Sequence, residues 1–178
     1  MEEKVLKTFR KVMDGITFVE KVLMAILIAV VSLVAFGNVV SRYLMPEVPW
    51  SFTEELVINL FVPLSLLGAA VLAREEGGLI GMALFTGFLP RKGQRIMNIV
   101  MVVFGLFFCY VMITTGYTKA VTDFAMNKLT YVLRMPIGIF TATIPACGVL
   151  MAMHLVEFAI ENIYYIVKGE DPETEVDA

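Results

Sequence analysis

The sequence predicts an all-α integral membrane protein with four transmembrane helices, and its composition and the spacing of its charges lead to this prediction. Of its 178 residues, 58% are hydrophobic, and the mean hydropathy is +0.80; soluble domains are roughly half apolar. A hydrocarbon core of about 30 Å needs about 20 apolar residues per helical crossing. Segments of nearly that length, free of Asp, Glu, Lys and Arg, cover residues 22–40, 56–73, 96–113 and 137–155.

Basic residues are distributed unevenly around these spans, and this predicts the orientation of the chain. If the N-terminus is cytoplasmic, ten of the 14 Lys and Arg residues lie inside, as the positive-inside rule requires. The four on the outside are Arg42, Lys119, Lys128 and Arg134. We therefore expect both termini in the cytoplasm. The net charge of −3 does not indicate nucleic-acid binding.

The residues before the first span allow two interpretations. Apolar side chains recur at steps of four, three and four residues, with lysines on another face; they are Val5, Phe9, Val12 and Ile16. This pattern is typical of an amphipathic helix in the headgroup layer, but it also fits a cytoplasmic extension of the first span. The span itself is longer than the apolar region of a secretory signal and is followed by no small-residue cleavage site, so it is expected to remain as an anchor.

The segment from Ser41 to Arg74 is predicted to form a hairpin at the outer surface. Pro46 and Pro49 interrupt the helix there. Tyr43 and Trp50 are amphipathic aromatic residues, which favour the membrane–water interface. These residues are therefore expected to fix the depth of the hairpin in the membrane.

The start of the second span carries a capping signal. Ser51 and Glu54 have the spacing of a capping box, which places the helix start one or two residues after Ser51. Glu54 and Glu55 then lie in the first turn, where a helix N-terminus favours negative charge. Arg42 ends the preceding helix on the same side of the membrane. We expect it to form an ion pair with one of these carboxylates and so clamp the hairpin.

Two rows of small residues predict close helix contacts within the membrane. One row on the second span repeats every fourth residue and is flanked by a glycine: Ser65, Ala69, Ala73 and Gly68. The other, on the fourth span, consists of Gly138, Ala142 and Ala146. Small side chains let helix backbones approach closely in lipid. Each row is thus a candidate contact with another helix of this chain or of a partner.

The remaining segments complete a single domain over residues 1–168. Residues 79–89 are apolar but too short to cross a bilayer, so they are expected to form a short interfacial or re-entrant element that ends at Pro90. Pro136 is well placed to open the fourth span. Residues 169–178 are acidic and are predicted to be disordered.

His154, Glu157 and Glu161 are predicted to share one helix face by their i, i+3 and i+7 spacing. Ionisable groups at membrane depth often mark an ion or proton path. These residues, however, lie in the last turns of the fourth span. The favoured interpretation is therefore a hydrogen-bonded anchor at the cytoplasmic rim, or a contact with a partner.

The sequence lacks the residue sets of several functional classes. Bis-histidine haem ligation needs two histidines, and the chain has one. Cys109 and Cys147 lie within spans without CxxC spacing, so they are expected to be small hydrophobic residues. The span centres hold no acidic residue of the kind that a four-helix proton antiporter needs. We expect no enzyme activity and no cofactor; a scaffold that binds another membrane protein fits best.

The hairpin resembles a known family. Its motifs are Ser41-Arg42-Tyr43, Pro49-Trp50-Ser51, Glu54-Glu55-Leu56, and Leu67-Gly68-Ala69-Ala70 followed by Arg74. They are similar to the small membrane subunit of tripartite ATP-independent periplasmic (TRAP) transporters, the Q subunit or DctQ family. That family commonly has a histidine shortly after the arginine that closes the second span. Here Gly77-Gly78-Leu79 occupies that region.

The resemblance implies an accessory, non-enzymatic role in the inner membrane of a bacterium or archaeon. The expected partners are a large elevator-type membrane subunit, a periplasmic substrate-binding protein and membrane lipid. The large subunit would carry the sodium and substrate sites, for organic acids such as a C4-dicarboxylate, a keto acid or a sialic acid. This chain would brace it and help to dock the binding protein. The alternative is a self-sufficient homo-oligomeric transporter or channel with His154 and Glu157 in its path.

Overall fold

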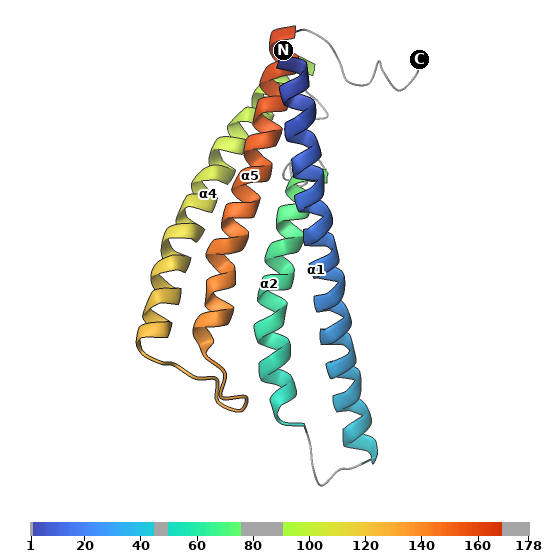
Figure 1. The fold of residues 1–178 in the computed structure, drawn as a ribbon, viewed down its shortest axis with the longest axis vertical. Helices are drawn as coiled ribbons and strands as arrows, with labels where there is room; N and C mark the ends of the chain where they lie inside the picture. The colour runs from blue at the N-terminus through green and yellow to red at the C-terminus, as the bar shows by residue number, and fades with distance from the viewer. Residues whose placement is uncertain (1, 45–49, 76–90, 169–178) are drawn as a thin grey trace.

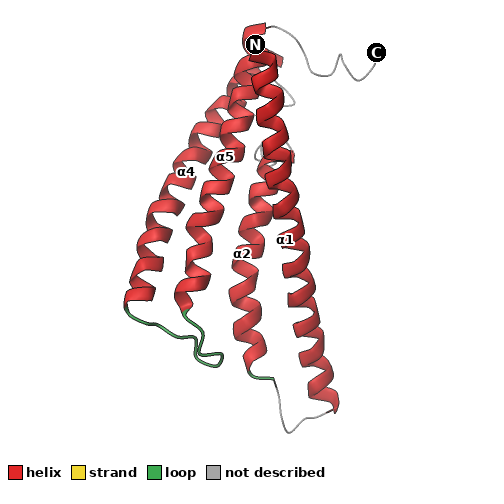
Figure 2. Ribbon diagram, in the orientation of Figure 1, coloured by secondary structure: helices red, strands yellow, loops and turns green. Residues whose placement is uncertain are grey.

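The computed structural model describes residues 2–44, 50–75 and 91–168, and these form four long helices. They are α1 (Glu2–Leu44), α2 (Phe52–Glu75), α4 (Arg91–Ala125) and α5 (Ile137–Lys168). Within these residues, helices and loops make up the fold (Figure 2). Each predicted span lies inside one helix, and all four helices are long and apolar enough to cross a membrane. The predicted all-α, four-span fold is confirmed.

The helices form a row rather than a closed bundle. α4 packs on α5, α5 on α2, and α2 on α1. α1, α4 and α5 converge where the first residues of α1 meet the last residues of α5, and the helices spread toward the opposite end (Figure 1). Little of the apolar surface is covered within the chain. In the most apolar 18-residue stretch of α2, 28% of the residues are buried, and in that of α1 0% are buried. The row therefore presents broad apolar faces to its surroundings.

α1 is much longer than a membrane crossing. Its 43 residues span about 65 Å at 1.5 Å per residue, twice the thickness of a hydrocarbon core. The N-terminal stretch is helical and continues unbroken into the first span, so the structure supports an extension of that span. The predicted apolar face of this N-terminal stretch points away from the other helices, since Phe9 and Val12 are exposed. Met13, Thr17 and Glu20 are buried instead.

Glycines on α4 let that helix approach α5 closely. A Cβ added to Gly105 would lie 2.8 Å from Leu155 Cδ1. One added to Gly116 would lie 2.9 Å from Pro145 Cδ and 3.2 Å from Pro145 N. A proline ring and a backbone nitrogen cannot rotate away, so the contact at Gly116 fixes the distance between the two helices.

Replacing Gly116 with leucine is therefore expected to force α4 away from α5. Overpacking of this kind costs about 1 to 3 kcal/mol, and more where backbone must shift. A lower midpoint of thermal unfolding in detergent would show the effect. Gly15→Leu is the matched control, because a Cβ at Gly15 meets nothing within 4 Å. Equal midpoints for the two variants would contradict the assigned contact.

Three predictions fall outside the described residues. They are the proline-rich turn of the hairpin at residues 45–49, the short interfacial element at residues 79–89 and the acidic tail at residues 169–178. α5 begins directly after Pro136, as expected, and α2 begins at Phe52, one residue after Ser51.

Candidate functional site

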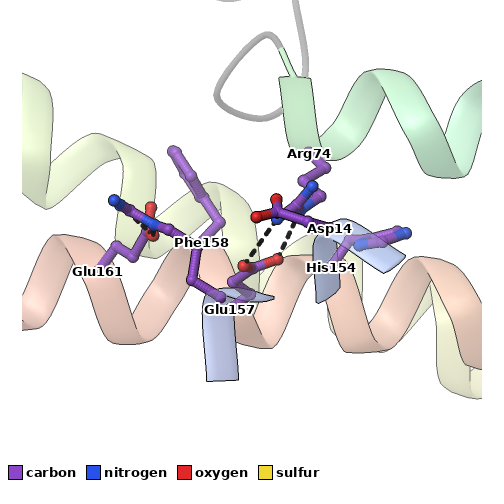
Figure 3. Close-up of a pocket in the computed structure, with 7 residues that line it drawn as sticks. Asp14, Arg74, His154, Glu157, Phe158 and Glu161 are labelled. Carbon is purple, nitrogen blue, oxygen red and sulfur yellow. Dashed lines mark hydrogen bonds and ion pairs between the residues drawn. The ribbon is translucent and has the colours of Figure 1, made fainter. Parts of the chain in front are cut away.

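Charged and polar side chains from three helices meet where the helices converge, and we call this group the polar cluster. It joins α1, α2 and α5. Its members are Arg10, Asp14, Thr17, Glu20, Arg74, His154, Glu157 and Glu161. Most of them surround a cavity of about 200 Å³ (Figure 3).

Arg74, in the last turn of α2, is the centre of the polar cluster. Its Nε donates to Glu157 Oε2 at 2.8 Å, and its Nη2 donates to Glu157 Oε1 at 3.2 Å and to Asp14 Oδ1 at 2.6 Å. Its Nη1 donates to Thr17 Oγ1 at 3.0 Å. The planar guanidinium matches a carboxylate in this two-bond geometry. One side chain thus connects α2 to both α1 and α5 (Figure 3).

A second contact, between Glu20 and His154, is fully enclosed. Glu20 Oε2 and His154 Nε2 lie 2.8 Å apart, and the two side chains are 2% and 0% exposed. The other polar atoms of the pair, Glu20 Oε1 and His154 Nδ1, have no hydrogen-bond partner among the described residues. The contact joins α1 to α5 one turn deeper than Arg74. Burial of polar atoms without hydrogen-bond partners costs free energy, so we expect the stability of the fold to be sensitive to changes in this pair.

The outermost contact of the polar cluster is partly exposed. Arg10 donates to Glu161 Oε1 through Nε at 3.0 Å and Nη2 at 2.6 Å. Their side chains are 51% and 27% exposed, so solvent weakens this ion pair. The carboxylates of Asp14, Glu157 and Glu161 are each engaged by an arginine. The arrangement is suited to fastening helices together, as the predicted anchor at His154 and Glu157 required.

At the opposite end of the row, Glu55 holds a loop instead of pairing with Arg42. Its carboxylate accepts hydrogen bonds from the backbone N–H groups of Tyr131, Val132 (2.9 Å) and Leu133 (3.0 Å). In the described part of the chain, no ion pair joins Arg42 to Glu54 or Glu55. The predicted clamp is therefore wrong. The α4–α5 loop supplies three clustered donors that satisfy both oxygens of Glu55.

The hairpin is instead joined by an aromatic contact. A Cβ added to Gly37 of α1 would lie 2.7 Å from Trp50 Cζ3, so the indole ring lies directly against that helix. Trp50 also stacks on Phe52, with ring centroids 5.6 Å apart. Tyr43 is 84% exposed at the end of α1. Trp50 thus connects the start of α2 to α1, while Tyr43 faces the surroundings.

The predicted rows of small residues do not form single faces. Ala73 is buried and Gly68 faces Met24 of α1, but Ser65 and Ala69 are exposed. Ser65 donates its hydroxyl to the carbonyls of its own helix.

On α5, Gly138 lies under the ring of Phe124, which a Cβ would approach to 2.7 Å, and Ala142 is half-buried. This row therefore contacts α4 at its first residue. In the row on α2, Ala69 has a small, exposed side chain and is therefore available to contact a partner.

The α1 members of the polar cluster were not predicted from the sequence. Arg10, Asp14, Thr17 and Glu20 recur at steps of four and three, so they share a helix face. That polar periodicity, on a face beside the apolar one and running toward the membrane, was the available signal. Two of the four, Thr17 and Glu20, are buried.

Comparisons with known proteins agree with this architecture. Residues 31–164 match the family model of the DctQ component of tripartite ATP-independent periplasmic transporters. A Haemophilus influenzae protein described as a TRAP transporter small permease protein is 29% identical over 144 residues, which cover 81% of this chain and 87% of the relative. The family model begins within the first span and extends through the other three. This multi-pass membrane protein therefore belongs to the DctQ family, the small permease subunits of TRAP transporters.

Proposed function

We propose that this protein is a static brace for the large membrane subunit of a sodium-coupled TRAP transporter for organic acids. The observation that carries the proposal is the open row of helices fastened by the polar cluster. A row with broad uncovered apolar faces is suited to lie along another membrane protein. Fastening by Arg74, Glu157 and the Glu20–His154 pair would keep the row from deforming when the large subunit moves.

The sodium and substrate sites are proposed to belong to the large subunit. In this chain, the carboxylates of the polar cluster are engaged by arginine or histidine, which supports a fastening role over ion coordination. The substrate class proposed is an organic acid of the C4-dicarboxylate, keto acid or sialic acid type. The protein is proposed to lie in the inner membrane of a bacterium or archaeon. The end of the row with Tyr43, Trp50 and Glu55 is proposed to face the periplasm, and both termini are proposed to lie in the cytoplasm.

Co-expression with the large subunit of the same transporter tests the proposal. A stable stoichiometric complex is expected in mild detergent, and transport in proteoliposomes is expected only when both subunits and the binding protein are present. If this protein alone moved protons or solute, the alternative of a self-sufficient homo-oligomeric transporter with His154 and Glu157 in its path would replace the proposal.

Replacing Ala69 with phenylalanine is expected to weaken that complex. Ala69 is exposed in the second span, and a bulky side chain there would hold a partner helix away. The measurement is the amount of large subunit retained on the tagged small subunit, expected to fall several-fold. Ala35→Phe, at an exposed position of α1, serves as the control. Equal retention for both variants would show that Ala69 faces lipid.

A further inference from the structure

We infer that the α4–α5 loop, residues 126–136, contains a preformed binding site for a carboxylate, and that Glu55 fills this site as a strap between α2 and the α4–α5 pair. The site consists of three backbone N–H groups, those of residues 131–133. The strap joins the helices at the end of the row where they spread apart. The inference goes beyond the proposed function and does not depend on it, because it concerns contacts within this chain alone.

The donors of the site are three consecutive backbone N–H groups that converge on one carboxylate. Glu55 Oε2 accepts from Val132 N at 2.9 Å and from Leu133 N at 3.0 Å, and Glu55 Oε1 accepts from Tyr131 N. Consecutive N–H groups that point to one side of a turn form a concave anion site, called a nest. Hydrogen bonds from N–H groups to an ionised carboxylate are roughly twice as strong as those between neutral groups.

The loop holds these donors in place by its own contacts. Thr130 N donates to Met135 O at 2.8 Å, and Met135 N donates to Thr130 Oγ1 at 2.9 Å, so the turn that carries the donors is closed at its base. Arg134, within that turn, has a φ of 54°. Ile137 N donates to Lys128 O at 2.9 Å, which ties the two ends of the loop together just before α5 begins.

The α4 side of the loop is anchored as well. Asn127, with a φ of 46°, follows the end of α4 and donates its N–H to Phe124 O at 3.0 Å. The buried carboxylate of Asp123 contacts Lys119 Nζ at 2.8 Å and Lys128 Nζ at 3.1 Å. All of these partners belong to α4, α5 or the loop itself. We therefore expect the donors to keep their positions when the Glu55 carboxylate is removed.

Glu55 comes from a different helix and so connects two parts of the row. It lies in the first turn of α2. The helices spread toward this end, and the loop reaches from α4 and α5 toward the start of α2 (Figure 1). The row is thus fastened at both ends, by Arg74 in the polar cluster at one end and by Glu55 at the other.

The site selects carboxylates by charge and by shape. Three donors engage two oxygens of one planar group, and both oxygens of an ionised carboxylate accept hydrogen bonds. A neutral amide of the same shape has one acceptor oxygen, and its NH₂ group would face the loop donors with another donor. Since the donors are backbone atoms held by the loop, a soluble carboxylate is expected to occupy the site once Glu55 is removed.

The central test uses Glu55→Ala in the purified chain in detergent, with hydrogen exchange at the amides of residues 131–133 as the measurement. Without a carboxylate, exchange is expected to accelerate about tenfold, because the three N–H groups lose their acceptor. Sodium acetate at about 1 M is expected to restore most of the protection, whereas acetamide at the same concentration should not. Glu54→Ala, at the exposed neighbouring carboxylate, is the control and is expected to exchange like the unaltered chain.

A second measurement tests the strap. Spin labels are placed at Ile58 on α2 and Val121 on α4, both exposed, in a background where Cys109 and Cys147 are replaced by alanine. Glu55→Ala is expected to lengthen the distance between the labels and to broaden its distribution about twofold. Acetate is expected to protect the loop amides without narrowing this distribution, because a free carboxylate fills the site but is not attached to α2.

Other results would overturn the inference. If exchange in Glu55→Ala is fast and acetate does not slow it, the loop is not a preformed carboxylate site. If the distance distribution is unchanged, Glu55 is not a strap. Should the alanine variant not fold, Glu55→Gln replaces it: its amide keeps one acceptor oxygen, so an intermediate exchange rate is expected, and a rate equal to that of the unaltered chain would contradict the need for a carboxylate. These measurements are independent of assembly with the large subunit, which tests the brace separately.

Discussion

Replacing Arg74 with alanine is expected to lower the free energy of unfolding by about 3 to 5 kcal/mol, the cost of removing one partner from a buried ion pair. Glu157 is 4% exposed, and no other arginine contacts it among the described residues. Loss of the guanidinium would also release Asp14 and Thr17, so the α1–α2 and α2–α5 contacts would loosen together. The measurement is the midpoint of thermal unfolding of the purified protein or complex.

Two further variants separate the geometry of Arg74 from its charge. Arg74→Lys keeps the charge but cannot form the two-bond contact with Glu157 while reaching Asp14 and Thr17, so only partial recovery is expected. Arg42→Ala, an exposed arginine at the other end of the row, should leave the midpoint nearly unchanged. If Arg74→Ala were as stable as Arg42→Ala, the polar cluster would not be the fastening of the row.

The four crossings could be predicted from the sequence because lipid leaves few alternatives. A segment without water around it must satisfy its backbone internally, so a long uncharged apolar run becomes a helix. The helices extend past the predicted spans because charges such as Glu20 and Arg74 end the apolar runs without ending the helix. The order of the helices in the row could not be predicted, since apolar residues pack equally well against several neighbours or against lipid.

The polar cluster could be predicted only in part. Spacing along a helix predicts which residues share a face, but it does not predict which residues of other helices contact that face. The i, i+3, i+7 spacing placed His154, Glu157 and Glu161 together. Their partners come from residues more than 80 positions away in the sequence.

The error at Glu55 has a related cause. Arginine is the obvious partner for a carboxylate in a sequence, whereas backbone N–H groups are present at nearly every residue and leave no signal. Only the shape of the α4–α5 loop turns three of them toward one side chain.

Replacing Glu20 and His154 together by leucine is expected to be far less damaging than replacing either one. Each single change leaves the other polar group buried without its hydrogen-bond partner, which costs about 1 to 3 kcal/mol, and more for a charged group. The double change removes both groups, including the two atoms that already lack partners, and introduces apolar side chains of similar size. Exchanges of this kind are often neutral or stabilising, by about 1 to 4 kcal/mol.

Four thermal midpoints measure this coupling: those of the unaltered protein, the two single variants and the double variant. If the losses simply added, the 2.8 Å contact between Glu20 and His154 would contribute nothing to stability. Transport by the reconstituted complex then separates the two roles open to a buried histidine–carboxylate pair. A stable Glu20→Leu/His154→Leu complex that still transports would assign the pair to fastening α1 against α5. A stable complex that no longer transports would show that the pair itself takes part in transport, because the helices would still be held in place.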